Sequence, residues 1–346
     1  MRRAAPQFWW RPRLSPAALA LYPVSRIWGA ASAWRMARTG GWRAPVAVIC
    51  VGNFVVGGAG KTPTSIALAR MARGRGLRPG LLSSGYGGSA TEPVLVDPAK
   101  HAADLVGDEP LLLAAVAPTV VSRDRAAGAR RLVEENIDVI IMDDGFQNPS
   151  LVHDLALVAV DASVGIGNGM VVPSGPLRAP LKPQMRRATA LLVIGEGEAA
   201  DPLIRAAARS GTAIVRARIR PTRVKEWRKE PILAYAGIGH PEKFFATLRE
   251  SGAPLARTLS FPDHYSFEEI DAIKLVEIAE SEKLRLVTTE KDFARLSGKP
   301  GAFAKLRERS EPFHVILEFE NPVAVGEMID AAVRKAALAQ PAGKPS

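Results

Sequence analysis

The chain has 346 residues, of which 47% are hydrophobic and 23% are charged. This composition is typical of a folded protein with a sizeable core, and it excludes an intrinsically disordered chain. A single cysteine, Cys50, excludes an internal disulfide, and nothing suggests a zinc site. The net charge of +11 would favour a nucleic-acid partner if it were spread over the chain.

Most of the excess positive charge lies in residues 1–44. This segment contains eight arginines and no acidic residue, so the remaining chain carries 38 basic and 35 acidic side chains. It also contains five of the six tryptophans, which are Trp9, Trp10, Trp28, Trp34 and Trp42. Arginine and tryptophan around apolar patches are typical of a helix that lies in a membrane interface. The longest uncharged run, Leu14 to Ser25, is 12 residues long and is too short to span a bilayer.

Three interpretations of this segment stay open from the residues alone. It can be an amphipathic membrane-interface helix, a helix packed on its own domain, or an arm that binds nucleic acid. We favour the first, because the body of the chain is nearly neutral and the segment lacks the features of a secretory signal. The expectation is a peripheral protein on the cytosolic face of a membrane, with no nucleic-acid partner.

The stretch from Val46 to Ala69 predicts a strand, a phosphate-binding loop and a helix. Glycines allow successive backbone N–H groups to converge on one anion, and the start of the helix adds its positive dipole end. The spacing departs from the G-x-x-x-x-G-K-[ST] pattern at Val55, and a plain strand-to-helix turn is the alternative. The residues expected to bind a nucleotide are Gly57, Gly58, Ala59, Gly60, Lys61 and Thr62.

A second stretch, Ile137 to Gln147, predicts a buried strand that ends in Asp143 and Asp144. Carboxylates at the carboxyl end of a parallel strand lie where such sheets bind ligands, and Mg²⁺ prefers oxygen ligands. We therefore expect Asp143, Asp144 and Thr62 on the metal side of the site. The alternative is an ordinary turn or helix cap.

Two further pairs of charged residues lie at the ends of predicted helices or strands. Asp108 and Glu109 open an apolar helix, where Asp108 is either an N-cap or a base that accepts a proton from a substrate hydroxyl. Arg123 and Arg125 follow a short strand, where they either contact phosphoryl oxygens or form solvated ion pairs.

Alternating strands and helices predict a P-loop NTPase-like α/β fold with a mostly parallel sheet. A glycine- and proline-rich loop at 165–178 interrupts this alternation, and Glu290 to Asp292 is expected to be a charged turn. From about residue 201 the alternation begins again, which predicts a second, smaller α/β lobe. The expected units are the membrane-interface segment at 1–44, the P-loop core at 45–200, the smaller lobe at 201–338 and a disordered tail at 339–346.

Seven motifs in this order resemble the tetraacyldisaccharide 4'-kinase family of lipid A biosynthesis. They are VGNFVVGGAGKTP (51–63), SGYGG (84–88), GDEP (107–110), DDGFQ (143–147), PSGPLR (173–178), FPDHY (261–265) and TTEKD (288–292). The resemblance implies a peripheral inner-membrane enzyme that transfers the γ-phosphate of ATP to the 4'-hydroxyl of a tetraacyldisaccharide 1-phosphate, giving lipid IVA.

The resemblance also implies roles for single residues. Lys61 and Thr62 would hold phosphate and Mg²⁺, with Asp143 and Asp144 on the metal side. Asp108 would be the base, aided by Glu109. The remaining side chains that would line the site are Gln147, Arg178 and His264.

Three positions depart from the family pattern. Ser84 stands where an arginine usually precedes Gly-Tyr-Gly, Asn148 where histidine commonly follows the glutamine, and Ala179 where glutamate often follows Leu-Arg. Loss of an arginine near a transferring phosphate would remove a stabilising charge. A kinase-derived, membrane-attached ATP-binding protein with little turnover is therefore one alternative, and a phosphate-loop ligase acting on a soluble acid is another.

Overall fold

The computed structural model describes residues 5–11, 15–263 and 265–340 of the chain. His264 and nearly all of the expected disordered tail lie outside these residues. The expectations for them therefore stay predictions.

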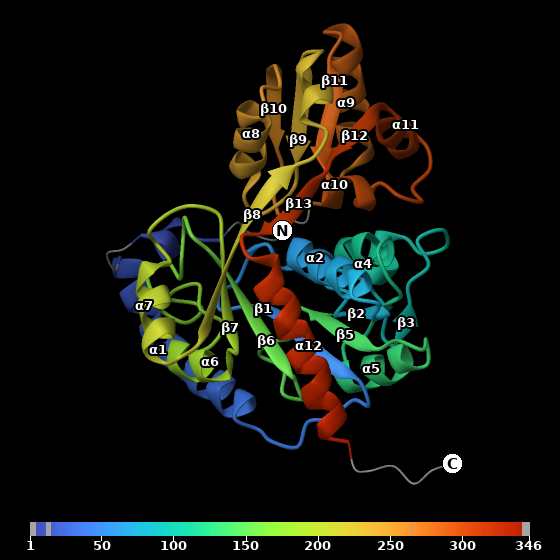
Figure 1. Ribbon diagram of the computed structural model, residues 1–346. Helices are drawn as coiled ribbons and strands as arrows, with labels where there is room; N and C mark the ends of the chain where they lie inside the picture. Colours follow the sequence, from blue (N-terminus) through green and yellow to red (C-terminus); the bar gives the residue numbers. More distant parts are fainter. Residues whose placement is uncertain (1–4, 12–14, 264, 341–346) are drawn as a thin grey trace.

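A nine-stranded sheet forms the larger of two domains (Figure 1). The strands lie in the order β13-β8-β7-β6-β1-β5-β2-β4-β3, and only β13 and β3 run antiparallel to their neighbours. Their bounds are β1 (Ala47–Asn53), β2 (Pro79–Ser83), β3 (Val94–Leu95), β4 (Thr119–Val121), β5 (Val139–Asp143), β6 (Leu155–Asp161), β7 (Ala190–Ile194), β8 (Ala213–Pro221) and β13 (Val315–Phe319). The mostly parallel sheet expected from the sequence is confirmed.

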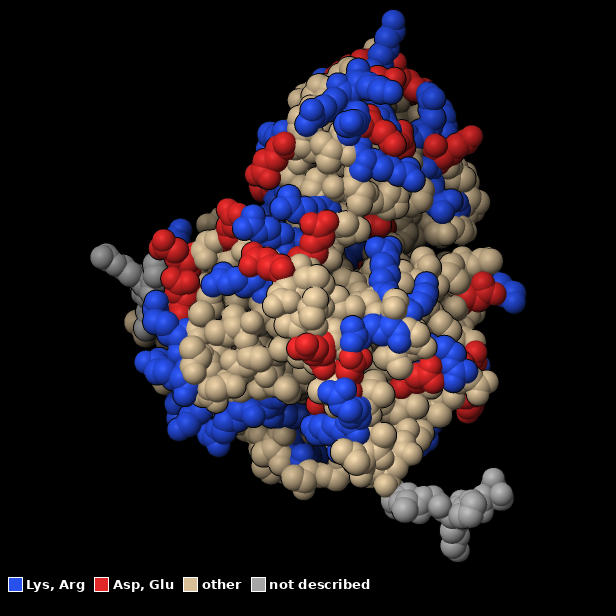
Figure 2. Space-filling view, viewed as in Figure 1, with Lys and Arg blue, Asp and Glu red and all other residues tan. Residues whose placement is uncertain are grey.

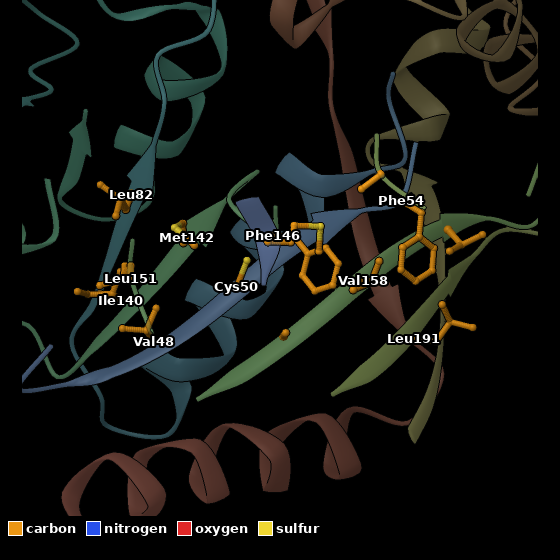
Figure 3. Close-up of a cluster of buried hydrophobic side chains, with 14 of the residues drawn as sticks. Val48, Cys50, Phe54, Leu82, Ile140, Met142, Phe146, Leu151, Val158 and Leu191 are labelled. Atoms are coloured by element: carbon orange, nitrogen blue, oxygen red, sulfur yellow. The ribbon is translucent and has the colours of Figure 1, made fainter. Parts of the chain in front are cut away.

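Helices cover both faces of this sheet, so its central strands are buried along nearly their whole length and are mostly apolar. On one face lie α2 (Lys61–Gly74), α4 (Asp108–Ala114) and α12 (Pro322–Leu338). On the other lie α1 (Pro16–Met36), α5 (Arg125–Val133), α6 (Leu181–Arg187) and α7 (Asp201–Arg209). Figure 3 shows the core on this second face, where Cys50 lies among apolar side chains. Burial raises the pKa of the Cys50 thiol to about 12, as expected for an inert core cysteine.

The smaller domain contains a four-stranded parallel sheet in the order β10-β9-β11-β12. Its strands are β9 (Ile232–Ala236), β10 (Leu255–Ser260), β11 (Arg285–Thr289) and β12 (Ser310–Phe313). Its helices are η2 (Val224–Arg228), α8 (Pro241–Glu250), α9 (Glu269–Ser281), α10 (Glu290–Arg295) and α11 (Ala302–Arg309). Figure 1 shows this domain at the top, joined to the larger one through the long strand β8 and its partner β13.

The second unit is smaller than the span of 201–338 that the sequence suggested. α7, β8, β13 and α12 all belong to the larger domain, where β13 returns to pair with β8 and α12 packs beside β1 and α2. The alternation of strands and helices after residue 200 is a local pattern, whereas the pairing of β13 with β8 joins segments that lie far apart in the chain. The expected charged turn at 290–292 is instead the first turn of α10, with Thr289 as its N-cap.

The N-terminal segment packs against the loop at 165–178. Trp9 of η1 (Gln7–Trp10) donates its indole N–H to the carbonyl of Pro173 at 2.9 Å. Ser25 of α1 donates to the carbonyl of Val171 at 2.7 Å. The short helix α3 (Ala103–Val106) completes the described elements.

Candidate active site

The phosphate-binding loop joins β1 to α2. Gly57 and Gly60 adopt left-handed conformations with φ of +113° and +75°, which favour glycine. At Gly60 a side chain would also meet Ile194, because a Cβ there would lie 2.8 Å from its Cδ1. Gly57 and Gly58 border the cavity and have open space around their Cβ positions. The side chain of Ala59 is buried in the core, so only its backbone can contribute to the loop.

Lys61 lies at the start of α2 and folds back over the loop. Its ammonium donates to the carbonyl of Gly57 at 3.3 Å and lies 3.5 Å from the carboxylate of Asp144. Burial lowers the pKa of Lys61, and the negative charge of Asp144 opposes that shift. The ammonium therefore lies where a phosphate group on the loop would meet it.

Asp143 ends β5 and is almost completely buried. It accepts hydrogen bonds from the hydroxyl of Thr62 at 3.2 Å and from that of Ser65 at 3.0 Å. Burial, followed by the negative charge of Glu109, raises the pKa of Asp143 to about 7. Ser65 was not predicted, although its position three residues after Thr62 places both hydroxyls on one side of α2.

Asp144 is bound in a different way from its neighbour. Its backbone has a φ of +55°, and its two carboxylate oxygens accept from the guanidinium of Arg178 at 2.8 and 3.0 Å. Although burial raises the pKa of Asp144, Lys61 and Arg178 outweigh burial and bring it to about 2. Adjacent carboxylates with opposite pKa shifts are a recurring feature of functional sites.

The acidic residues at the start of α4 face the smaller domain. Asp108 accepts from Nε of Arg295 at 2.8 Å, and Glu109 forms an ion pair with Lys291. Both cations belong to α10. Gly107, not Asp108, is the N-cap of α4, and one oxygen of Asp108 accepts from the backbone N–H of Glu109 at 2.9 Å.

Arg295 is the residue that sequence reasoning missed most clearly. It is buried, and it also donates to Asp292 at 2.6 Å and to the carbonyl of Gly237 at 2.7 Å. It is 187 residues from Asp108 in the chain. No local pattern could therefore have indicated the contact.

A cavity of about 1520 Å³ lies between the two domains. Its lining contains most of the predicted site residues, namely Gly57, Gly58, Gly60, Lys61, Thr62, Glu109, Asp144, Gln147 and Arg178. Asp108 and Asp143 are buried close behind this lining. The structure therefore brings together the phosphate-loop and DDGFQ stretches.

Neither of the two arginines considered from the sequence, Arg123 and Arg125, lines the cavity, and only one of the three departures from the family pattern does. Arg125 is buried and donates to the carbonyls of Ser122 and Asp144, which is a structural role. Arg123 is exposed and donates to the carbonyl of Gly88. Of the three departures, Ser84 lines the cavity, Asn148 accepts from the N–H of Ser150, and Ala179 is buried.

The donor set suits a hard divalent cation. Thr62 and the two carboxylates of Asp143 and Asp144 offer oxygen atoms at the phosphate-loop end of the cavity. Mg²⁺ typically uses one or two carboxylates and completes its shell with water and substrate phosphates. Among the described residues, no group of three His, Cys, Asp or Glu side chains could hold a metal by itself. The residues present therefore fit a metal that arrives with a nucleotide.

Helix α1 has a buried inner face and an exposed outer face, and the exposed side also carries Arg26 and Arg35. Its inner face is made of small or flexible residues that pack on the domain, namely Ala18, Ser25, Gly29, Ser32 and Met36. Its outer face exposes large apolar side chains, namely Leu19, Tyr22, Val24, Ile27, Trp28 and Trp34. Figure 2 shows Lys and Arg along the lower left edge of the larger domain, where Figure 1 places α1, α6 and α7. Within the described parts of the chain, no helix is long and apolar enough to cross a membrane.

Comparisons with known proteins agree on one family. The family model described as Tetraacyldisaccharide-1-P 4'-kinase matches residues 17–334. The chain is 50% identical over 332 residues to "Tetraacyldisaccharide 4'-kinase" of Rhizobium meliloti (strain 1021), covering 96% of each protein. It is 47% identical over 329 residues to the protein of the same name in Agrobacterium fabrum (strain C58 / ATCC 33970), covering 95% of this chain and 94% of that protein.

A solved structure shares the fold. The crystal structure of LpxK from Aquifex aeolicus in complex with ATP matches with a TM-score of 0.71 and 24% sequence identity. The match covers 92% of this chain and 99% of that chain.

Proposed function

The chain belongs to the tetraacyldisaccharide-1-phosphate 4'-kinase family, and from this membership we propose that it transfers the γ-phosphate of ATP to the 4'-hydroxyl of a tetraacyldisaccharide 1-phosphate. The product is lipid IVA. The bond between the γ-phosphorus and the oxygen that leaves with ADP breaks, and a bond to the sugar oxygen forms. The hydroxyl proton passes to a base. Catalysis of such a transfer consists mainly of positioning and charge neutralisation.

The phosphate loop supplies the groups that hold ATP. Backbone N–H groups of residues 57–60 and the ammonium of Lys61 bind the β- and γ-phosphates. Gln147 and Arg178 border the same end of the cavity. Arg178 is already fixed by Asp144, which supports a role in charge neutralisation without a large rearrangement.

The metal side consists of Thr62, Asp143 and Asp144. Mg²⁺ bound there with ATP would neutralise charge that develops on the transferring phosphate. The hydrogen bonds from Thr62 and Ser65 fix both oxygens of Asp143, so this carboxylate is oriented before ligands bind. A cation beside Asp143 would also offset the cost of its buried charge.

Asp108 is the base in this proposal, and Glu109 aids it. Glu109 lines the cavity, and Asp108 precedes it in the first turn of α4, where Arg295 binds its carboxylate. His264 completes the proposed catalytic set, as its place in the FPDHY motif suggests.

The outer face of α1 holds the enzyme on the cytoplasmic face of the inner membrane. Its exposed apolar side chains enter the interface, and Arg26 and Arg35 meet the headgroups. The lipid substrate then keeps its acyl chains in the bilayer while its sugar headgroup reaches the cavity. The Trp28 and Arg35 side chains that border the cavity support this route.

One observation carries the proposed activity: Lys61, Asp144 and Arg178 line one end of a large cavity, and Asp143 is buried next to Asp144. The test is transfer of labelled γ-phosphate to purified disaccharide 1-phosphate in detergent micelles with Mg²⁺. We expect transfer by the wild type and by Asp97→Asn, which changes a surface carboxylate, and a loss of at least about a hundredfold in Asp108→Asn. A wild type that binds ATP and transfers nothing would contradict the kinase and favour a binding protein.

Membrane attachment has a separate test. We expect the double variant Ile27→Ser/Trp34→Ser to sediment with anionic phospholipid vesicles at least about tenfold more weakly than the wild type, because each change removes apolar area from the interface. Val323→Ser changes an equally exposed apolar residue on α12 and should leave binding unchanged. Equal binding by the double variant would exclude this face of α1 as the anchor.

A further inference from the structure

A buried amide lies behind the phosphate-loop end of the cavity. Gln184 of α6 is fully buried, and its Nε2 donates to the carbonyl of Ala179 at 2.6 Å and to that of Phe54 at 3.5 Å. A carbonyl oxygen accepts and cannot donate, so the amide group of Gln184 can have only one orientation. Its oxygen, Oε1, is therefore the atom that faces Gln147.

Gln184 in turn determines the orientation of Gln147. Nε2 of Gln147 donates to Oε1 of Gln184 at 2.9 Å and to the carbonyl of Asn53 at 2.7 Å. These two contacts use both N–H bonds of the Gln147 amide. Its own Oε1 accepts no hydrogen bond from the described residues, and Gln147 lines the same cavity as Lys61 and Asp144.

We propose that Gln184 is a positioning residue, which holds the Gln147 amide with its oxygen available to the cavity so that it accepts a hydrogen bond from a sugar hydroxyl of the lipid acceptor. This inference rests on the proposed function. The triphosphate of ATP offers only acceptor oxygens at this end of the cavity, so it cannot be the partner of Oε1. The acceptor sugar brings hydroxyl donors there.

The orientation of the Gln147 amide matters because a rotated amide would donate hydrogen bonds into the cavity instead of accepting one from the sugar hydroxyl. A rotated amide would present N–H groups to the cavity and would place its oxygen against the carbonyl of Asn53 and Oε1 of Gln184. Three oxygens without a proton between them are strongly unfavourable in a buried place. As long as Gln184 is present, Gln147 is held as an acceptor.

A double-mutant cycle on the full-length enzyme tests this coupling, with labelled phosphate transfer in micelles as the readout. Gln184→Met and Gln147→Leu should each lower kcat/KM for the lipid about tenfold, since each disturbs one hydrogen bond to the substrate. KM for ATP should stay unchanged. The double variant should be no worse than Gln147→Leu alone. Gln340→Met, a change of an exposed glutamine, is the matched control.

Additive losses in the cycle would overturn the proposal, because they would show that Gln184 acts only on packing. A rise in KM for ATP with no change for the lipid would overturn it as well. If the wild type transfers no phosphate at all, the proposed function fails and this inference fails with it. An active wild type with additive losses removes only the positioning role, so the two failures are distinguishable.

Gln184→Glu supplies a pH readout of the hydrogen bond that fixes residue 184 on the carbonyl of Ala179. The neutral acid can donate to the carbonyl of Ala179 and accept from Gln147, as glutamine does. The ionised carboxylate cannot donate, and burial raises the pKa of such a group. Activity of this variant should therefore fall with rising pH relative to the wild type. Parallel pH profiles for the two proteins would show that this hydrogen bond is not needed to hold Gln184, which would contradict the fixed orientation on which the positioning role depends.

Discussion

The cavity has two acidic pairs that are held from opposite sides. The phosphate-side pair, Asp143 and Asp144, is bound entirely by groups of the larger domain. The interdomain pair, Asp108 and Glu109, also belongs to that domain but is bound by two cations of α10 in the smaller one. The phosphate-side pair is therefore in place within one domain, whereas the interdomain pair reaches its arrangement only when both domains meet. We therefore expect substitutions around the phosphate-side pair to act mainly on phosphate transfer, and substitutions around the interdomain pair to act mainly on the stability of the fold.

The largest effect should come from the cation beside the phosphate-side pair. Lys61→Met keeps much of the side chain and removes the charge, so phosphate transfer should fall by about 10² to 10³-fold or more. The stability of the fold should change much less. Lys225→Met, an exposed position in η2, is the control for loss of one lysine. Transfer within tenfold of the wild type would show that Lys61 does not act on the transferring phosphate.

At the interdomain pair, the main effect should be on stability. Arg295→Met leaves the buried carboxylates of Asp108 and Asp292 without their guanidinium, which should lower the free energy of unfolding in urea by about 3 kcal/mol. Lys291→Met affects a more exposed pair with Glu109 and should cost about 1 kcal/mol. If both variants lost equal stability, the buried contact would not be the one that joins the domains.

A smaller effect should follow from the carboxylate that Thr62 and Ser65 orient. Asp143→Asn should raise the Mg²⁺ concentration for half-maximal transfer about 10- to 100-fold, because a charged oxygen near the metal is lost. Asp138→Asn, on the surface, should leave the Mg²⁺ requirement unchanged. An unchanged requirement in Asp143→Asn would remove this residue from the metal side.

The smallest effect concerns acid stability. The pKa of Asp144 is about 2 in the folded protein, below its usual value of 3.8, because Lys61 and Arg178 outweigh burial. A carboxyl whose pKa is lowered by folding stabilises the protein above its unfolded pKa, and this contribution is lost as pH falls toward the folded value. Between pH 4.5 and 2.5 the unfolding free energy of the wild type should therefore fall more than that of Asp144→Asn, by about 1–2 kcal/mol. Parallel acid titrations of the two proteins, by urea unfolding, would contradict the shift.

The sequence was sufficient where chemistry is local. The strand, glycines and Lys61 of the phosphate loop are adjacent in the chain, and the paired aspartates directly follow an apolar strand. Their positions in the fold could therefore be predicted. Short-range signals were sometimes present but overlooked: Thr289 and Asp292 have the spacing of a helix cap, yet the stretch was interpreted as a turn.

The remaining features depend on contacts that no local pattern encodes. Arg295 reaches Asp108 across 187 positions and Gln184 reaches Gln147 across 37. A buried arginine or glutamine has the same local sequence signature as an exposed one. The domain boundary was misplaced for the same reason, since β13 joins β8 only after the whole smaller domain has intervened.

The N-terminal segment forms hydrogen bonds with a loop that lines the cavity. Trp9 and Ser25 bind the loop at 165–178, whose Pro176 carbonyl accepts from the N–H of Val56 in the phosphate loop at 2.8 Å, and whose last residue is Arg178. A truncation at residue 44 would therefore remove both the proposed membrane anchor and this support of the loop, and lost activity would not distinguish them. Only changes confined to the outer face of α1 separate the two. In the proposed membrane-attached state, the helix that would set the distance between bilayer and cavity therefore also supports the loop that lines the cavity.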